Sequence, residues 1–324
     1  MNDPGPPAAR PILVTGCHRS GTTWVGEMLA ASSRVAHVHE PLNPAYRLSW
    51  LGAPPERPYL HITVDDDLGL GPSFDRLFAL RAPFGAWVRS TRSPRHVAAD
   101  LRESWRAIRW RRERRRVLVK DPLAVMAADW LASRYGCEVV ALVRHPAAFA
   151  GSLKRLGWEF DFRDFARQPT LMEGPLRRFA DDVERAAAHP PDIIDQAVLV
   201  WRCVNHVVAG YAEARPEWSV ERYEDLASDP VDGARRLYAR LGLPWDGATA
   251  GRVARLSSGD NPAEVALGRT RDVQRDSASA MWTWTHRLDP DEIERVRRGT
   301  ADVAARFYGA ADWDPPRWAA SASS

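Results

Sequence analysis

The sequence predicts an α/β protein of three layers, in which a central parallel sheet lies between two layers of helices. Residues 11–31 predict a short apolar strand, a turn bounded by glycines and then a helix, the usual start of an open α/β sheet. Residues 138–143, Glu-Val-Val-Ala-Leu-Val, are nearly continuously apolar, as expected of a central parallel strand buried on both faces. The 324 residues suffice for one large domain, and no linker divides them.

The composition is that of a soluble globular protein, with 45% hydrophobic and 27% charged residues. No apolar run approaches the roughly 18 residues that span a bilayer, and the first ten residues lack a basic-then-apolar signal pattern. We therefore expect a cytoplasmic protein. The three cysteines, Cys17, Cys137 and Cys203, are widely spaced, so neither a disulfide framework nor a zinc site is expected.

The charge of the chain is unevenly distributed. The net charge is +3, but residues 102–116 contain eight Arg and two Glu and so carry +6, which leaves −3 for the rest. A general nucleic-acid-binding surface is therefore not expected. The basic segment needs an explanation of its own.

The first strand, loop and helix form a candidate phosphate site. Ile12, Leu13 and Val14 predict the strand, and Gly16 and Gly21 lie at the two ends of the turn. The loop and first-turn N–H groups lack internal partners, and the helix dipole favours an anion there. The loop carries Arg-Ser-Gly-Thr-Thr where a P-loop NTPase has Gly-Lys-Ser/Thr, which weakens a magnesium–nucleotide interpretation. The candidate binding residues are Cys17, His18, Arg19, Ser20, Gly21, Thr22, Thr23 and Trp24.

A second strand is predicted over residues 34–39, and it ends at Glu40-Pro-Leu-Asn-Pro. With one helix between two parallel strands, Glu40 and Arg19 fall at the same carboxyl edge of the sheet, where such sheets bind ligands. Residues 45–94 are irregular, with a short helix at 74–81, and we expect part of an acceptor pocket or lid there. Asp65, Asp66 and Asp67 cannot all face one ion, so a solvated loop is expected.

A long helix is predicted from Ser93-Pro94 to about Glu113. Its apolar residues recur at helical spacing and predict a face packed on the core: Val97, Leu101, Trp105 and Ile108. Its far end is the arginine-rich run. That run fits either a solvated helix face or a basic wall beside an anionic acceptor or a membrane surface.

Two further strands end in polar residues. Residues 116–120 predict a strand that ends at Lys120-Asp121-Pro122, followed by a helix. The apolar strand 138–143 ends at Arg144-His145-Pro146, and the next helix carries Ser152. Arginine suits phosphate recognition because its planar fork binds two oxygens at once.

The C-terminal half predicts helices over 193–214, 230–241 and 289–308, with a fifth strand in Trp218–Leu226 that ends in a turn. Residues 156–192 carry no motif that we can assign. We expect a disordered segment over residues 1–10, a single domain over 11–310 and a C-terminal tail over 311–324.

The loop from Arg19 to Trp24 resembles the 5′-phosphosulfate loop of the sulfotransferases that use 3′-phosphoadenosine 5′-phosphosulfate (PAPS). A second match is Arg144 with Ser152 eight residues later, which resembles the pair that holds the 3′-phosphate in that family. The resemblance covers roughly residues 11–308, with gaps at 45–93 and 156–192. It implies the P-loop-like sulfotransferase fold, and PAPS as the sulfuryl donor.

The resemblance also implies catalytic roles. Lys-Asp-Pro at Lys120 is similar to protein-tyrosine and carbohydrate sulfotransferases, where the Lys reaches the sulfate. Several family members place a catalytic Glu just after the second strand, and Glu40 fits that position. Hormone-type cytosolic members use a His instead, which leaves three alternates: His37, His39 and His61.

The family further implies contacts to the nucleotide. A Tyr-Glu-Asp-Leu segment similar to Tyr223–Leu226 has its Tyr near the adenine, and Trp24 would stack there too. A Ser-containing segment and an Arg-rich loop follow in the family. Arg275-Asp276-Ser277, followed by Trp282 and Trp284, resembles that loop in bacterial members. The residues assigned are Ser257, Arg275 and Ser277, with Arg269 and Arg271 as alternates.

The implied reaction is an in-line transfer of the sulfuryl group to a hydroxyl or amine of a small-molecule, carbohydrate or lipid acceptor. Arg19 would stabilise the leaving phosphate, Lys120 the sulfate oxygens, and Glu40 would take the acceptor proton. The donor's negative charge is expected to raise the pKa of Glu40. No metal is implied. Two other classes stay open: a P-loop kinase or NTPase with Asp121 on magnesium, and a non-catalytic nucleotide-binding protein.

Overall fold

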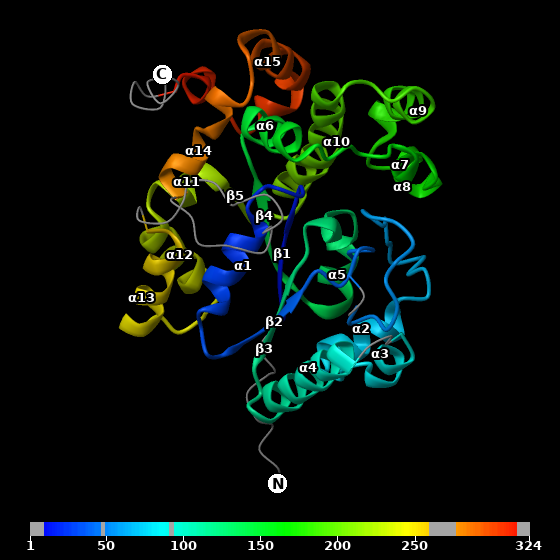
Figure 1. The fold of residues 1–324 in the computed structure, drawn as a ribbon, viewed down its shortest axis with the longest axis vertical. Coiled ribbons are helices and arrows are strands. Elements are labelled where there is room, and N and C mark those ends of the chain that lie inside the picture. Colours follow the sequence, from blue (N-terminus) through cyan, green and yellow to red (C-terminus); the bar gives the residue numbers. More distant parts are fainter. Residues whose placement is uncertain (1–9, 47–48, 91–93, 259–276, 316–324) are drawn as a thin grey trace.

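The computed structural model describes residues 10–46, 49–90, 94–258 and 277–315. Its centre is one parallel sheet of five strands in the order β2-β3-β1-β4-β5 (Figure 1). The strands are β1 Ile12–Gly16, β2 Val35–His39, β3 Arg116–Lys120, β4 Glu138–Val143 and β5 Ser219–Arg222. The predicted strands are all present in these positions.

The strand β1 lies in the middle of the sheet, with β3 on one side and β4 on the other. Ile12 lies opposite Leu118 on β3 and Glu138 on β4. The chain leaves β1 toward β2 and β3, and later crosses to β4 and β5 on the other side. Ligands of open α/β sheets bind where the chain reverses direction in this way. The carboxyl end of β1 is therefore the expected site.

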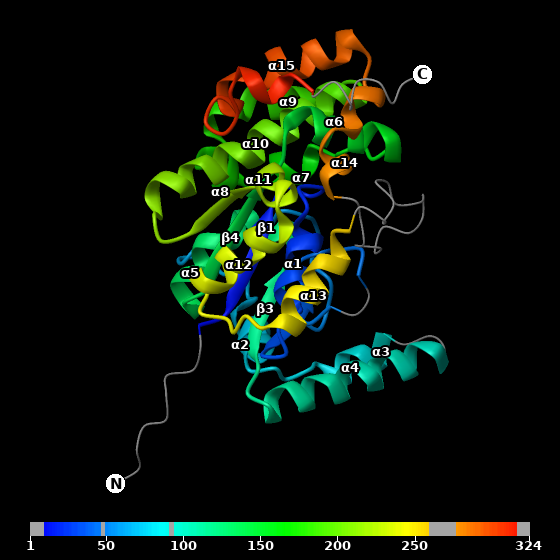
Figure 2. The ribbon, with the colours of Figure 1, turned by 90° about the vertical axis from the view of Figure 1, so that its left-hand side faces the viewer.

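Alternate residues of β1 point to opposite faces of the sheet, and helices cover both. Ile12 and Val14 pack with α1 (Thr22–Ala30), α12 (Pro230–Arg240) and α13 (Gly247–Leu256). Leu13 packs on the other face with α5 (Ala128–Tyr135). Farther along that face, Ala141 and Val143 pack with α6 (Pro146–Leu156), α10 (Ile193–Ala214) and α15 (Pro290–Ala304). This confirms the three-layer α/β/α fold (Figures 1 and 2).

Two regions contain more helix than the sequence patterns predict. Residues 45–93 include α2 and α3, and residues 156–192 include three helices and a 3₁₀ turn. Tyr223 begins a helix rather than the expected turn. The bounds are α2 Gly71–Phe78, α3 Phe84–Ser90, α7 Arg163–Ala166, α8 Pro169–Glu173, η2 Arg177–Phe179, α9 Ala180–Ala188 and α11 Tyr223–Ser228.

The remaining elements complete the two ends of the domain. They are η1 Pro122–Ala127, α14 Ser277–Met281, η3 Thr283–His286 and η4 Ala310–Trp313. In η4, Trp313 meets the His145 ring edge-on, with centroids 4.4 Å apart, and Asp312 pairs with Arg222. Packed structure therefore extends to residue 313, beyond the start assigned to the C-terminal tail.

The predicted core face of the long helix α4 (Pro94–Arg112) is wrong for three of its four residues, and the fourth, Ile108, is half-buried. Val97, Leu101 and Trp105 are 39%, 44% and 67% exposed. The buried residues of α4 are instead Asp100, Ala107 and Trp110. Helical spacing fits both stripes, and the second packs because Trp110 meets Trp50, with ring centroids 6.4 Å apart.

Candidate active site

A cavity of about 1060 Å³ lies at the carboxyl ends of the strands. Residues at or after the carboxyl end of each of the five strands line it, from the ranges 18–24 after β1 and 39–46 at the end of β2, Pro122 and Leu123 after β3, Arg144 after β4 and Tyr223 after β5. Its far wall is the side of α4 that carries Ala99, Glu103 and Arg106. The site expected at this edge of the sheet is therefore a real cavity, and it joins the phosphate loop to α4.

The phosphate loop has the backbone that an anion site needs. Gly16, Arg19 and Gly21 all have positive φ angles, 142°, 63° and 96°, which turn the chain sharply between β1 and α1. Gly21 occupies the position before α1, and no side chain caps that helix. Its first-turn N–H groups and the positive end of its dipole thus face the cavity.

Gly21 is required for a second reason besides its φ angle. A Cβ added there would lie 2.5 Å from Cδ2 of Tyr223. Such a distance is far below van der Waals contact, so the loop and the start of α11 pack against each other only because this residue is glycine. The loop is thereby packed against α11, the helix that follows β5.

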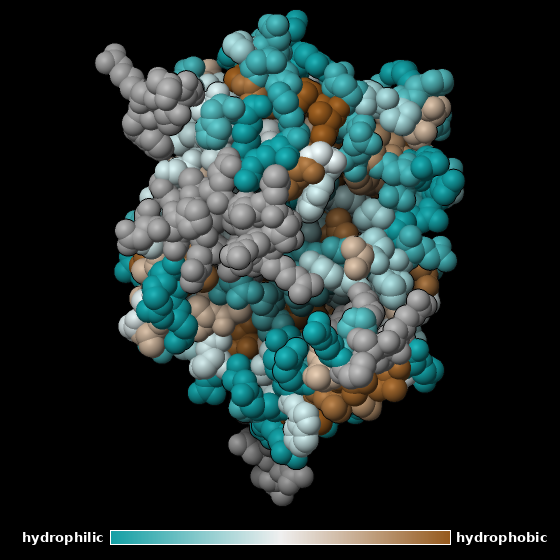
Figure 3. Space-filling model, viewed as in Figure 1, coloured by the Kyte–Doolittle hydropathy of each residue, from teal (hydrophilic) through white to brown (hydrophobic). Residues whose placement is uncertain are grey.

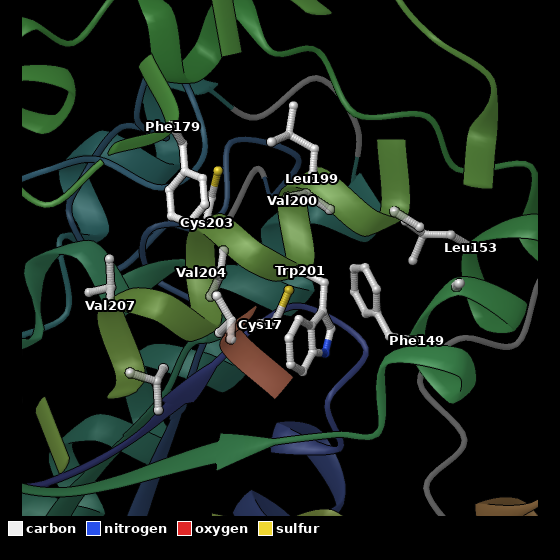
Figure 4. Packing of buried hydrophobic residues seen from close by; sticks show 14 of the residues in the cluster. Cys17, Phe149, Leu153, Phe179, Leu199, Val200, Trp201, Cys203, Val204 and Val207 are labelled. Atoms are coloured by element: carbon white, nitrogen blue, oxygen red, sulfur yellow. The ribbon is translucent and has the colours of Figure 1, made fainter. Parts of the chain in front are cut away.

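The side chains at the start of the loop point into the protein. Cys17 is buried with Trp201 and Val204 of α10 (Figure 4), and burial raises the pKa of its thiol to about 12. The ring Nδ1 of His18 lies 2.6 Å from the Tyr59 hydroxyl oxygen, and the backbone N–H of His18 donates to the same oxygen over 3.0 Å. Burial, with the charge of Arg19, lowers the pKa of His18 to about 4. Cys17 can therefore contact a ligand only through its backbone.

The predicted Arg144–Ser152 pair is arranged around Arg19. Nε of Arg19 donates to Oγ of Ser152 over 3.1 Å, and Arg144 donates to the backbone oxygen of Arg19 over 3.0 Å. The Arg19 guanidinium also lies 5.4 Å from the ring centre of Trp158. All three predicted residues come together, although Ser152 contacts Arg19 rather than Arg144.

Among the buried polar atoms that have no hydrogen-bond partner within the described residues are two at predicted phosphate-binding residues: Oγ of Ser20 and Nε of Arg144. A buried polar group without a partner costs about 1–3 kcal/mol. Both atoms belong to residues that the sequence assigns to phosphate binding. Their missing partners fit a phosphorylated ligand, whose oxygens would accept from both.

An aromatic corner adjoins the loop. The rings of Trp24 and Tyr223 meet edge-on with centroids 5.4 Å apart, and Nε1 of Trp24 donates to Oγ of Ser257 over 3.1 Å. The Arg144 guanidinium lies 4.9 Å from the ring centre of Tyr223. Ser277 is buried and donates to Ala227. Arg275 and the alternates Arg269 and Arg271 lie outside the described residues.

The predicted catalytic carboxylate and amine form an ion pair, in which Glu40 lines the cavity and Lys120 is fully buried. Nζ of Lys120 pairs with Oε1 of Glu40 and donates to Oγ1 of Thr23 over 3.0 Å. The second oxygen of Glu40 accepts from the amide of Asn43 over 2.6 Å. Lys120 thus connects the residue after β2 to the first turn of α1.

The electrostatics of this pair differ from the sequence expectation. Burial raises the pKa of Glu40, but the charges of Lys120 and His39 outweigh burial, and the net pKa is lowered. Burial lowers the pKa of Lys120, and Glu40 partly offsets this. In the protein alone Glu40 is therefore an ionised carboxylate, whereas the expected rise in its pKa requires the donor's charge nearby.

Asp121, the magnesium candidate of the NTPase alternative, does not face the cavity. It is fully buried, and its two oxygens accept from the N–H groups of Leu42 at 2.6 Å and Leu123 at 2.9 Å. Burial, together with the charge of Glu40, raises its pKa to about 7. Asp121 therefore ties the loop after β2 to the end of β3. The described residues contain no group of three His, Cys, Asp or Glu side chains arranged for a metal.

The alternate bases divide into two groups. His37 and His39 line the cavity, and Nε2 of His39 lies 3.7 Å from Oε1 of Glu40. The ring of His61 instead lies 3.0 Å from Oγ1 of Thr170 and is not among the residues that line the cavity. His39 is thus the alternate base that the geometry favours.

Three residues at the site were missed by the sequence analysis as functional: Tyr59, Asn43 and Trp158. Asn43 follows Glu40 by three residues in the Glu-Pro-Leu-Asn-Pro turn, so its spacing was a signal that could have found it. Tyr59 and Trp158 reach the loop from regions without a motif. Glu224 in the same segment as Tyr223 has a structural role, because it accepts from the His145 backbone N–H and the Tyr308 hydroxyl.

The fold and site define an α/β protein whose strand–loop–helix turn is suited to a phosphorylated anion and lies beside a lysine–glutamate pair. Residues 11–247 match the model of the sulfotransferase family. This chain belongs to that family. None of the helices in the described ranges has the length and apolar character of a membrane span.

Individual relatives agree with this assignment. Carbohydrate sulfotransferase 1 from Homo sapiens is 26% identical over 91% of this chain and 78% of its own length. The Rattus norvegicus protein of the same name is 25% identical over the same shares. Among solved structures, the sulfotransferase domain of the Synechococcus PCC 7002 olefin synthase has a TM-score of 0.50 at 19% identity, over 98% of this chain and 99% of that chain; it supports the fold.

Proposed function

We propose that this sulfotransferase uses PAPS as donor and transfers the sulfuryl group to a hydroxyl of a carbohydrate or another small acceptor. The observation that carries the proposal is the position of the Lys120–Glu40 pair. It contacts the first turn of α1 through Thr23, the same turn whose free N–H groups end the phosphate loop. A cation and a carboxylate base therefore lie directly beside the anion site.

We expect different residues to bind different parts of the donor nucleotide. The loop amides, Ser20 and Arg19 would hold the 5′-phosphosulfate. Arg144 and Ser152 would hold the 3′-phosphate, and Nε of Arg144 supports this because it is buried without a partner among the described residues. Trp24 and Tyr223 would contact the adenine. PAPS supplies the sulfuryl group, and the protein supplies alignment and charge.

The chemical step needs one base and one cation. Glu40 would accept the proton of the acceptor hydroxyl as its oxygen forms a bond to sulfur. The bond between sulfur and the bridging oxygen breaks, and the leaving phosphate keeps the electron pair beside Arg19 and the loop amides. Lys120 would offset charge on the sulfate oxygens. The Asn43 amide holds Glu40 in place.

The acceptor side of the cavity suits a hydroxylated molecule. Polar side chains line it together with aromatic ones, among them Tyr46, Trp50 and Trp110. The named relatives are carbohydrate sulfotransferases, which supports a carbohydrate acceptor. An amine or lipid acceptor, the single-domain boundaries and the cytoplasmic location stay predictions.

The test is an acceptor screen with PAPS and a panel of saccharides, phenols and alcohols, read out by the mass of the sulfated product. A parallel arm offers MgATP without PAPS. We expect sulfated product and no ATP turnover, because Asp121 is engaged with two backbone N–H groups. Magnesium-dependent ATP turnover, or tight PAPS binding with no transfer to any acceptor, would contradict the proposal.

A further inference from the structure

Apolar side chains are exposed together on α3 and α4. The described part of the chain exposes nine large apolar side chains, and five of them belong to these two helices: Phe84, Val88, Val97, Leu101 and Trp105. Figure 3 shows apolar side chains gathered over α3 and α4, near the lower edge of the view. Single exposed apolar residues are ordinary, but a group of them indicates an interaction surface.

The stripe on α4 is exposed because another stripe of the same helix makes the packing contacts. Val97, Leu101 and Trp105 repeat every fourth residue, so they share one side of the helix. Asp100, Ala107 and Trp110 are buried on a different side. The outward stripe is therefore not a misplaced core face, and among the described residues its side chains stay exposed.

Arginines accompany the apolar stripe. Six arginines and two acidic residues lie within α4, and three exposed arginines neighbour the stripe: Arg102, Arg109 and Arg112. Residues 102–116 carry +6 while the rest of the chain carries −3. This local positive charge complements a partner surface that is negatively charged on the outside and apolar below that layer. Trp and Leu on one side of a helix with Arg beside them are typical of helices that lie in a membrane interface.

We propose that the α3–α4 surface, made of these five apolar residues and Arg102, Arg109 and Arg112, docks on an anionic phospholipid bilayer. The apolar side chains would enter the boundary between headgroups and acyl chains, and the arginines would meet the lipid phosphates. The neighbouring side of α4 lines the cavity through Ala99, Glu103 and Arg106, and Arg109 of the docking surface lines it as well, so docking brings the cavity wall to the lipid headgroups. This binding does not depend on the proposed reaction.

The test is cosedimentation of the full chain with vesicles of phosphatidylcholine alone, or with about one third phosphatidylglycerol. We expect binding to the anionic vesicles that weakens with salt. Each arginine near such a surface contributes about fivefold. The triple change Arg102→Gln, Arg109→Gln and Arg112→Gln should therefore reduce partitioning by about a hundredfold. Leu101→Ser with Trp105→Ser should reduce it by at least about tenfold.

Two matched controls keep the result specific. Val64→Ser removes an apolar side chain that is 71% exposed outside this surface. Arg298→Gln removes an exposed arginine on α15, at the opposite end of the molecule (Figures 1 and 2). Both should bind vesicles like the parent. Circular dichroism and binding of 3′-phosphoadenosine 5′-phosphate confirm that each variant is folded.

Three results would overturn the proposal. The first is equal binding to neutral and anionic vesicles. The second is parental binding by both surface variants. The third is a concentration-dependent dimer in sedimentation velocity that Leu101→Ser with Trp105→Ser abolishes, because this surface would then be an interface between two copies of the chain.

Discussion

Glu40 and Lys120 contact each other through both backbone and side chains. The N–H of Glu40 donates to the carbonyl of Lys120 over 2.7 Å, and the Lys120 ammonium pairs with the Glu40 carboxylate. The two residues lie at the ends of adjacent parallel strands. Glu40 also has a φ angle of 44°, a strained conformation that the surrounding contacts maintain. The proposed base and cation are thus preassembled.

The Glu40→Gln change should reduce turnover about 10²–10⁴-fold while leaving nucleotide binding intact, because it removes basicity and keeps the shape. The measurement is single-turnover sulfation of a hydroxyl acceptor, since an amine can arrive deprotonated. Glu27→Gln, at another cavity-lining carboxylate, is the control. Near-normal turnover in Glu40→Gln would transfer the role to His39, and loss of nucleotide binding would make Glu40 a purely structural residue.

Arg19→Ala and Lys120→Ala should lower turnover more than they weaken nucleotide binding, because their charges act on groups whose charge changes in the transition state. Turnover at saturating PAPS is compared with the Kd for 3′-phosphoadenosine 5′-phosphate. If one of these variants keeps the parental turnover, the residue that it replaces has no catalytic role. Arg163→Ala, an exposed arginine paired with Asp161, serves as the control.

The chain should bind 3′-phosphoadenosine 5′-phosphate much better than 5′-AMP, and Arg144→Ala should reduce that preference by at least about tenfold. Arg144 also donates to the backbone of Arg19, so a purely structural loss would weaken both nucleotides equally. Titration calorimetry with both ligands separates the two cases. Equal parental affinity for the two nucleotides would refute the assignment of the 3′-phosphate site.

Gly21→Ala should abolish nucleotide binding and lower the melting temperature, whereas Gly242→Ala should lower the melting temperature alone. Both glycines have positive φ angles, 96° and 62°, but only the Cβ at position 21 meets Tyr223. The shared backbone cost is about 1–2 kcal/mol. Calorimetry and nucleotide titration of both variants provide the comparison. Equal nucleotide affinity in both variants would show that the loop tolerates a side chain.

Stability should fall as the pH drops below about 6.5, partly because of His145. Burial lowers the pKa of His145 to about 3 from the ordinary histidine value of 6.5. As the pH falls, His145 is therefore protonated in the unfolded state before it is protonated in the folded state. The neutral, buried ring contributes its full stabilisation above about pH 6.5, and this contribution is lost as the pH falls toward the folded pKa of about 3.

His145→Phe keeps an aromatic ring against Trp284, which stacks at a centroid distance of 5.4 Å, and removes the titration. Between pH 7.5 and pH 5 the parent should lose about 2 kcal/mol more than this variant. Urea unfolding at the two pH values measures the difference. Equal losses would mean that His145 does not control this pH dependence.

The local order of the site could be predicted because each part depends on a few consecutive residues. Apolar runs define the strands, and Gly16 and Gly21 define a turn that no other residues would permit so easily. Parallel strands place their carboxyl ends at one edge, so Arg19, Glu40, Lys120 and Arg144 were expected to come together there. These conclusions rest on covalent geometry and strand direction alone.

Tertiary packing decided what periodicity leaves open. Two stripes of α4 have helical spacing, and Trp50, distant in sequence, selected the one that contains Trp110 for burial. Ser152 contacts Arg19 rather than Arg144 because the register of β1 and β4 sets α6 against the loop. Asp121 faces backbone N–H groups because β2 lies beside β3. Such choices depend on energies between distant segments, which a pattern of neighbouring residues does not contain.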